Sequence, residues 1–172
     1  QEGYNQRVED QLLAASGWKD NGYRLYALAG AFADDSGGWY GQLFESGCFA
    51  MRRSDFLRLG GFDEAFTSPA GGLTSLDFFQ RALLADGMDY VILLGEGTFH
   101  QVHGGVATNA SVADHPWETF HREYLRIRGH RYIRVPRKPK YIGTVPPEAA
   151  AIADFSRKVG EQIWRTYPAV AE

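Results

Sequence analysis

Residues 95–105, GEGTFHQVHGG, combine residue types from which metal and acid–base sites are built. His100 and His103 lie three positions apart, and Glu96 stands between two glycines. Imidazole nitrogens bind metal ions and exchange protons near neutral pH. On an extended backbone, side chains three residues apart point to opposite faces, which favours one histidine as a metal ligand and the other as a hydrogen-bonding or phosphate-facing group. A turn at 101–102 would instead bring the two imidazoles together.

Three carboxylates are candidates for a general base. Glu96 follows an apolar run, and Glu45 lies inside the apolar segment 43–51, LFESGCFAM. Burying a carboxylate is costly unless it is paired or binds a cation, so both positions indicate function. Asp77 lies in the first turn of a predicted helix, where the helix dipole already favours an acid, so it has a structural interpretation as well.

The composition limits the class of protein. With 172 residues, 44% of them hydrophobic and 14% aromatic, the chain is long and apolar enough to fold as one domain. It has no apolar run of the roughly 20 residues that cross a bilayer, and its single cysteine fits a reducing compartment, so we expect a cytoplasmic protein.

The charge is unevenly distributed. Residues 121–140 contain eight Lys or Arg and one acid, whereas the whole chain has a net charge of −3. This basic segment is either a solvated face or a contact with phosphates or with the surface of an anionic membrane. The acidic remainder argues against a nucleic-acid partner.

Hydrophobic periodicity predicts an α/β fold with a mixed sheet and flanking helices. The predicted strands are 23–29, 43–51 and 90–95, the last buried on both faces. The predicted helices are 6–16, a short one within 52–61, 74–87, 115–129 and 148–167. Residues 135–147 contain four prolines and are predicted to be a connector without regular structure.

Several finer features are also predicted. Ser54 and Thr74 are expected to cap the N-termini of their helices, with Asp77 completing a capping box after Thr74. Gly60–Gly61 is expected to end the short helix. Asp77 and Arg81 are one turn apart and are expected to lie one above the other. The buried stripe of the helix is predicted at Leu76, Phe79, Leu83 and Gly87.

The order of these segments resembles the order of motifs in a known enzyme family. ESGCFAMRRSDFLRLGGFDEAF, then a glycine pair, LDFFQRALLADG, an apolar strand and FH are similar to the second half of a GT-A glycosyltransferase of the family 2 type, over about residues 40–105. Polypeptide N-acetylgalactosaminyltransferases are similar in the same order. The resemblance implies the C-terminal, acceptor-side part of a GT-A-like domain at 1–134, followed by a connector and terminal helix at 135–172.

The resemblance also implies an activity and a set of site residues. Such enzymes move a sugar from a nucleotide-sugar donor to a glycan, lipid-linked or small-molecule acceptor. His100 matches the late histidine of a Mn²⁺ or Mg²⁺ site, and Asp77 matches the last acid of the family's ED.D motif. The implied donor- or acceptor-binding positions are Gly47, Gly71, Gly72, Ser75 and His103.

Two departures from the family pattern keep alternatives open. The other two acids of the ED.D motif fall on Thr74 and Ser75, so Asp77, Glu45 or Glu96 takes the base role, the enzyme retains configuration, or the domain is inactive. The nucleotide-binding half with its Asp-x-Asp motif is missing, which implies either a fragment of a longer enzyme or a natural partial domain. The alternatives are a non-catalytic carbohydrate- or partner-binding module and a metal hydrolase that uses His100 and His103.

Overall fold

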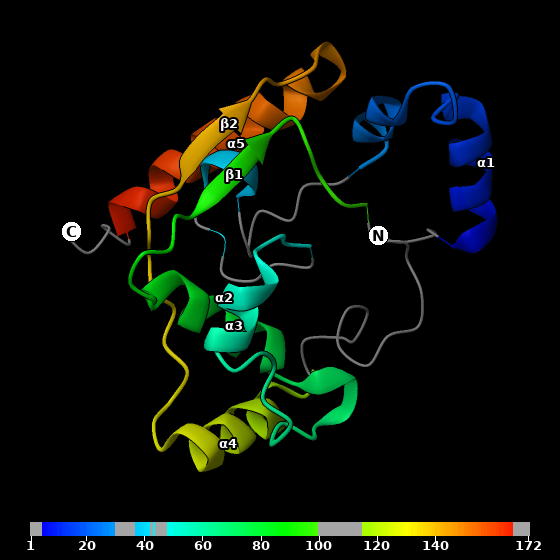
Figure 1. The fold of residues 1–172 in the computed structure, drawn as a ribbon. Coiled ribbons are helices and arrows are strands. Elements are labelled where there is room, and N and C mark those ends of the chain that lie inside the picture. Colours follow the sequence, from blue (N-terminus) through cyan, green and yellow to red (C-terminus); the bar gives the residue numbers. More distant parts are fainter. Residues whose placement is uncertain (1–4, 30–36, 42, 44–47, 100–114, 167–172) are drawn as a thin grey trace. The chain divides into compact units, whose positions relative to one another are not determined.

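The computed structural model of the chain describes residues 5–29, 37–41, 43, 48–99 and 115–166. These residues form a mixed α/β structure of α-helices, short 3₁₀ helices and a two-stranded parallel sheet (Figure 1). The α/β class is therefore confirmed at this level. The chain divides into two compact units, each assembled from separate segments: unit 1 consists of 1–43, 91–103 and 138–172, and unit 2 of 44–90 and 104–137.

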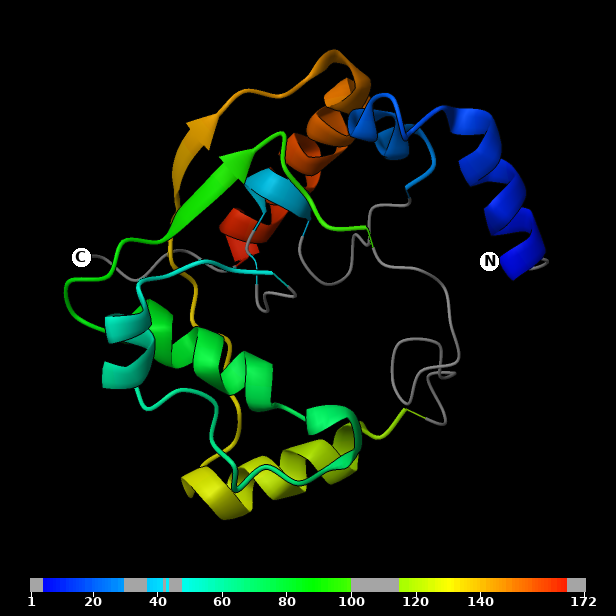
Figure 2. The same ribbon diagram turned by 45° about the vertical axis from the view of Figure 1, so that its right-hand side comes forward.

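The sheet of unit 1 pairs β1 (Val91–Leu94) with β2 (Lys140–Gly143), in the register that places Leu93 opposite Ile142. The two strands lie side by side, with α5 (Ala150–Thr166) near them (Figures 1 and 2). Ile92 is 6% exposed, whereas Leu93 and Ile142 are 55% and 59% exposed. The predicted strand at 90–95 is thus present, but the prediction that both its faces are buried is wrong for these residues. The prediction that 135–147 lacks regular structure is also wrong, because the backbone at 140–143 pairs with β1.

The helices of unit 1 begin with α1 (Gln6–Ser16), where the Asn5 side chain accepts a hydrogen bond from the Val8 N–H. The predicted strand at 23–29 is instead a 3₁₀ helix, η1 (Gly22–Ala27). The Asn21 side chain accepts from the Tyr23 N–H at its start. Residues three apart are eclipsed in a 3₁₀ helix, and Tyr23 and Tyr26 accordingly stack with ring centroids 6.4 Å apart.

Two further 3₁₀ helices complete the regular structure described for unit 1. η4 (Pro147–Ala149) leads into α5, which confirms the predicted terminal helix. η2 (Gly38–Tyr40) contacts both β1 and α5. It therefore links the sheet to the terminal helix.

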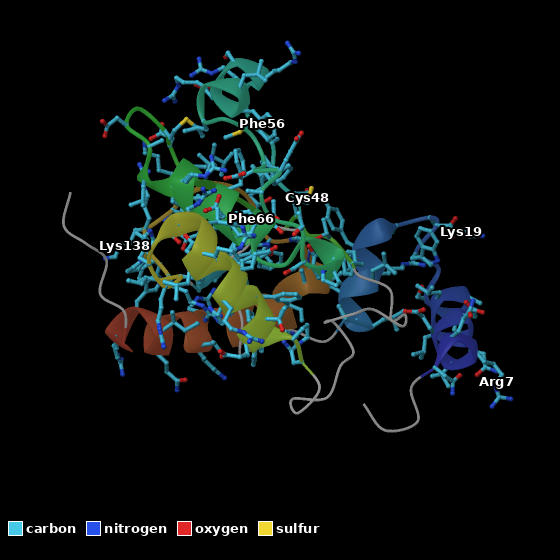
Figure 3. All side chains as sticks on the ribbon, turned by 90° about the horizontal axis from the view of Figure 1, so that it is seen from below. Arg7, Lys19, Cys48, Phe56, Phe66 and Lys138 are labelled. Atoms are coloured by element: carbon cyan, nitrogen blue, oxygen red, sulfur yellow. The ribbon has the colours of Figure 1, made fainter. Side chains whose placement is uncertain are left out.

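Unit 2 contains α2 (Arg53–Arg58), α3 (Thr74–Leu84) and α4 (Trp117–Arg128), with the short η3 (Pro69–Gly71) ahead of α3. Figure 3 labels Phe66, whose ring lies 5.9 Å from that of Tyr124 on α4. The buried stripe of α3 includes Phe78, 2% exposed, in place of the predicted Phe79. The core cluster consists of Phe66, Leu73, Leu76, Phe120 and Tyr124.

The predicted helix N-caps of unit 2 are wrong. The N-cap residues are Arg52 for α2 and Leu73 for α3, and neither provides a side-chain cap. Ser54 lies inside α2, two residues after the N-cap position. Thr74 lies inside α3, where its hydroxyl donates to the Gly71 carbonyl, and the predicted capping box does not form because Leu73 is the N-cap residue.

Two predicted helix ends are confirmed, whereas α3 ends at Leu84, three residues before the predicted end at Gly87, which is exposed. Gly60 and Gly61 follow α2 with φ of 79° and 60°, and the Gly61 N–H donates to the Phe56 carbonyl at 2.9 Å. Gly129 ends α4 with φ of 75°. The predicted strand at 43–51 lies partly outside the described residues, and its last four residues, which are described, form no strand. Among the described helices, none is long and apolar enough to cross a membrane.

Candidate functional site

The predicted site residues fall into three groups. Glu45, Gly47, His100 and His103 lie outside the residues that the structure describes. Gly71, Gly72, Ser75 and Asp77 lie in unit 2, around the N-terminus of α3, and Glu96 lies in unit 1, directly after β1.

The turn before α3 depends on its glycines. Gly71 and Gly72 have φ of 81° and 53°, in the left-handed region that side chains disfavour. A Cβ at Gly72 would lie 3.1 Å from Oε2 of Glu123, so the glycine also makes room for that carboxylate. Ser75 is exposed in the first turn of the helix. The structure thus brings Gly71, Gly72 and Ser75 together, and it explains Gly72 by backbone geometry and packing.

Glu123 on α4 holds this turn in place, although no sequence pattern singled it out. Its Oε1 accepts from the N–H groups of Thr67 and Ser68 at 2.8 and 3.0 Å, and from the Thr67 hydroxyl at 3.1 Å. Burial alone would raise the pKa of the Glu123 carboxyl, but these hydrogen bonds outweigh burial and lower it. Glu123 is therefore a charged anchor for the segment that precedes α3.

Asp77 is 1% exposed and lies between two arginines. Its Oδ2 accepts from Arg81 Nε at 2.9 Å, which confirms the predicted pairing of these residues. Arg128, 51 residues away, donates to both carboxylate oxygens at 2.7 Å. Burial alone would raise the pKa of Asp77, but the bonds from Arg128 and Arg81 outweigh it, so the pKa is lowered. A general base needs an oxygen that faces its substrate, so this geometry favours the structural interpretation of Asp77.

The two arginines extend the network. Arg81 also donates to the carbonyl oxygens of Leu59 and Gly61, the latter at 2.7 Å. Arg128 forms a second ion pair, with Asp63 at 2.8 Å. Its hydrogen bond with Asp77 raises the pKa of the Arg128 guanidinium. One carboxylate therefore ties α3 to α4 and to the segment that follows α2.

Part of the basic segment 121–140 thus has structural partners. Arg128 pairs with Asp77, and Arg137 donates to the carbonyl oxygens of Leu83 and Met88. Arg122 and Arg126 have side chains that are 70% and 66% exposed. A phosphate or membrane contact through this segment stays a prediction that depends on its exposed members.

Glu96 lies at the carboxyl end of β1, in a setting made by three aromatic donors. The Tyr23 hydroxyl donates to Glu96 Oε1 at 2.8 Å. The indole N–H of Trp39 donates to the Glu96 carbonyl at 2.7 Å, and the Tyr26 hydroxyl donates to the Gly95 carbonyl at 2.9 Å. Backbone and carboxylate of Glu96 are both held, while the residue itself stays exposed.

The rings around Glu96 form a cluster that we call the Glu96 aromatic cluster: Tyr23, Tyr26, Trp39 and Phe99. Tyr26 packs edge-on against Trp39 and Phe99, with centroids 5.5 and 5.0 Å away. Tyr23 and Phe99 are 37% and 41% exposed. A carboxylate beside exposed aromatic faces can orient a polyhydroxylated ligand, because the rings contact its apolar face and the carboxylate accepts from its hydroxyls.

The tyrosines of this cluster are held in the protonated, donating form. The hydrogen bond to Glu96 raises the pKa of Tyr23. Burial, followed by the charge of Glu96, raises the pKa of Tyr26 to about 12. No local pattern could link these tyrosines to Glu96, because they are about 70 residues away in sequence.

The predicted Mn²⁺ or Mg²⁺ site has no support from the described residues. Within 5–29, 37–41, 43, 48–99 and 115–166, no group of three or more His, Cys, Asp or Glu is placed to hold a metal ion. His100 and His103, from which the cation site and the alternative hydrolase site were predicted, lie outside these ranges.

Comparisons with known proteins find no relative of this chain. No family model matches the chain, and searches of curated proteins and of solved structures find no match.

Proposed function

We propose that this chain is the acceptor-side portion of a GT-A-like, family 2-like glycosyltransferase, which moves a sugar from a nucleotide-sugar donor to a glycan, lipid-linked or small-molecule acceptor. The observation that supports the proposal is the exposed carboxylate of Glu96 at the carboxyl end of β1, beside the Glu96 aromatic cluster. In open α/β sheets, ligands bind beyond the carboxyl ends of parallel strands.

The geometry suits activation of an acceptor hydroxyl. Glu96 would accept the hydroxyl proton as the hydroxyl oxygen bonds to the anomeric carbon of the donor sugar, while the bond from that carbon to the phosphate oxygen breaks and the nucleotide leaves. The Tyr23 hydroxyl fixes one carboxylate oxygen at 2.8 Å, and Trp39 and Tyr26 fix the backbone that carries it. The exposed faces of Tyr23 and Phe99 would contact the apolar face of the sugar ring.

Among the three proposed bases, Glu96 has the geometry that fits best. Asp77 is enclosed by Arg81 and Arg128, and Glu45 lies outside the described residues. The proposal retains a divalent cation, Mn²⁺ or Mg²⁺, as the cofactor expected at His100, and none of the roles given to Glu96, Tyr23 and Trp39 depends on it. A cytoplasmic location with peripheral membrane contact through 121–140 belongs to the same proposal.

The test compares Glu96→Gln with the original residue in the longer enzyme that this proposal implies, with its nucleotide-binding half present. Saturation-transfer NMR with a panel of mono- and oligosaccharides measures sugar binding, and sugar release from UDP- and GDP-sugars in Mn²⁺ measures transfer to acceptor or water. We expect Glu96→Gln to keep sugar binding and to lose turnover by about 100-fold or more, the contribution typical of a positioned base. Glu64→Gln, an exposed acid in unit 2, is the matched control and should leave both readouts unchanged.

A second function is favoured by a specific observation. Asp77 is an ion-pair anchor, and the residues at the other two acidic positions of the motif are Thr74 and Ser75. A non-catalytic carbohydrate-binding module would keep the Glu96 aromatic cluster without any base. Sugar binding without turnover of any nucleotide-sugar selects this module, and the absence of both binding and turnover refutes both functions.

A further inference from the structure

An open cleft beside α5 in unit 1 is lined by positively charged and aromatic side chains. Its volume of about 410 Å³ falls within the range of about 300–1,000 Å³ typical of small-ligand sites. Figure 3 labels Lys138, which contributes to its wall. The lining contains three cations and three aromatic rings: Lys138, Arg157, Arg165, Tyr40, Tyr141 and Trp164.

The base of the cleft is fixed by close contact between η2 and α5. Ser156, fully buried, accepts from the Tyr40 N–H at 2.9 Å, and its own hydroxyl donates to the Gly37 carbonyl. The indole N–H of Trp164 donates to the Tyr40 carbonyl at 3.0 Å. A Cβ at Gly160 would overlap with that same carbonyl, so the approach of η2 requires glycine at this position. The cleft is therefore preorganised, which lowers the entropic cost of binding.

The charges of the cleft favour an anion. Glu161, the acid among the described lining residues, lies 4.0 Å from Arg165, which leaves an excess of positive charge. Arg157 lies over the Tyr40 ring, 5.4 Å from its centroid, and pairs with Asp154 at 2.8 Å. That side chain is still 56% exposed. A planar guanidinium fixed on a ring presents paired N–H donors that match the oxygens of a phosphate.

The rings of the cleft favour a ligand that is more than a bare anion. Tyr141 is 40% exposed, with its centroid 5.5 Å from that of Tyr40. Trp164 is held by its bond to the Tyr40 carbonyl, so the indole has a fixed orientation. Such rings stack on nucleobases and pack on the apolar faces of sugars.

We propose that this cleft binds a small phosphate-bearing molecule whose phosphate contacts Arg157 and Lys138 and whose ring packs against Tyr141 and Trp164. A nucleoside phosphate and a sugar phosphate share this chemistry. The site goes beyond the proposed transfer reaction, because no residue of the Glu96 aromatic cluster lines it.

The test is isothermal titration calorimetry of the full chain with four probes: uridine monophosphate, a glucose phosphate, inorganic phosphate, and vesicles that contain phosphatidylglycerol. We expect one of the two ring-bearing phosphates to bind most tightly, and its identity distinguishes a nucleoside from a sugar ligand. Arg157→Gln should weaken that binding by about tenfold or more, because a charged hydrogen bond is lost. Lys158→Gln removes the same charge from the next, exposed position of α5, outside the lining, and should change the affinity by less than about twofold.

A third variant tests the rings. Tyr141→Leu should weaken binding of the ring-bearing phosphate and leave binding of inorganic phosphate unchanged. Circular dichroism of each variant checks that the helices are intact. The proposal is overturned if inorganic phosphate binds as tightly as both ring-bearing compounds, if Arg157→Gln and Lys158→Gln lose affinity equally, or if vesicles bind and no soluble phosphate does.

Discussion

Replacing Asp77 with Asn should destabilise unit 2 strongly. The substitution keeps the size of the side chain but removes the charge that Arg81 and Arg128 surround. Breaking a buried ion pair by removing one partner costs about 3–5 kcal/mol. The arginine side chains are 30% and 23% exposed and keep some contact with water, so we expect about 3 kcal/mol. For a slope of about 1–3 kcal/mol per molar urea, the midpoint should fall by about 1–3 M.

The measurement is urea unfolding followed by circular dichroism, with hydrogen exchange of peptides from α3 and α4 as a local readout. Glu118→Gln is the control, because Glu118 lies 3.9 Å from Arg122 with both side chains largely exposed. It should leave the midpoint unchanged, since exposed pairs contribute little. An Asp77→Asn variant that unfolds at the same midpoint as this control contradicts the structural role of Asp77.

The stability that the ion pairs of Asp77 contribute should depend on pH. The pKa of Asp77 is lowered in the folded chain relative to its ordinary value of 3.8. The stabilisation from Asp77 is therefore complete above pH 3.8 and is lost as the pH falls through the lower pKa of the folded state. The difference in stability between the original chain and Asp77→Asn should narrow below about pH 4. A difference that stays constant from pH 7 to pH 3 would refute the ionic origin of the effect.

Two further predictions concern unit 1. Gly95→Ala should destabilise the chain by more than about 1 kcal/mol in urea unfolding, because φ is 84° and the new Cβ overlaps with the Thr144 carbonyl. Gly22→Ala is the control and should be tolerated, because no atom lies within 4 Å of its new Cβ. Burial and the charge of Glu96 raise the pKa of Tyr26 to about 12, so its stabilisation is complete below pH 10 and is lost as the pH rises through 12. Spectrophotometric titration should show that Tyr26→Phe removes a phenol that ionises later than an ordinary tyrosine, and removal of an ordinary phenol would contradict this.

The helices were the most predictable part of the fold, because their apolar spacing and terminal glycines are local signals. Gly61 and Gly129 mark the ends of α2 and α4 as expected. The N-terminal signals failed at Thr74, which is the first residue inside α3, one position after the N-cap Leu73, and whose hydroxyl donates to the Gly71 carbonyl. A hydroxyl has several backbone partners within reach, and the spacing of residues does not decide among them.

The sheet was less predictable for a physical reason. β2 has four residues, and its pairing with β1 joins positions about 50 apart in sequence, for which there is no local signal. The segment at 23–29 alternates in polarity as a strand does, yet Tyr23 and Tyr26 also satisfy the period of a 3₁₀ helix. The cap from Asn21 and the stacking of the two rings are consistent with the helix.

Prediction of the candidate site from the sequence was limited in the same way, because its contacts are long-range. Asp77 and Glu96 were two of the three candidate bases in the sequence, and the structure gives them different surroundings. The side chain of Arg128 bonds to Asp77 from 51 residues away, and that of Tyr23 bonds to Glu96 from 73 residues away. Partners that distant depend on the tertiary fold, so sequence reasoning could nominate both carboxylates but could not tell the anchored one from the exposed one.

The two carboxylates are predicted to have different roles, Asp77 in the stability of the fold and Glu96 in catalysis. If Asp77 is an anchor, Asp77→Asn lowers the stability of the chain and leaves sugar binding at the Glu96 aromatic cluster intact in the molecules that remain folded. If Glu96 is the base, Glu96→Gln removes turnover without moving the urea midpoint, because an exposed carboxylate contributes little to folding. Turnover by folded Glu96→Gln together with its loss in folded Asp77→Asn would reverse the assignment, and the base would then have to act from between two guanidinium groups.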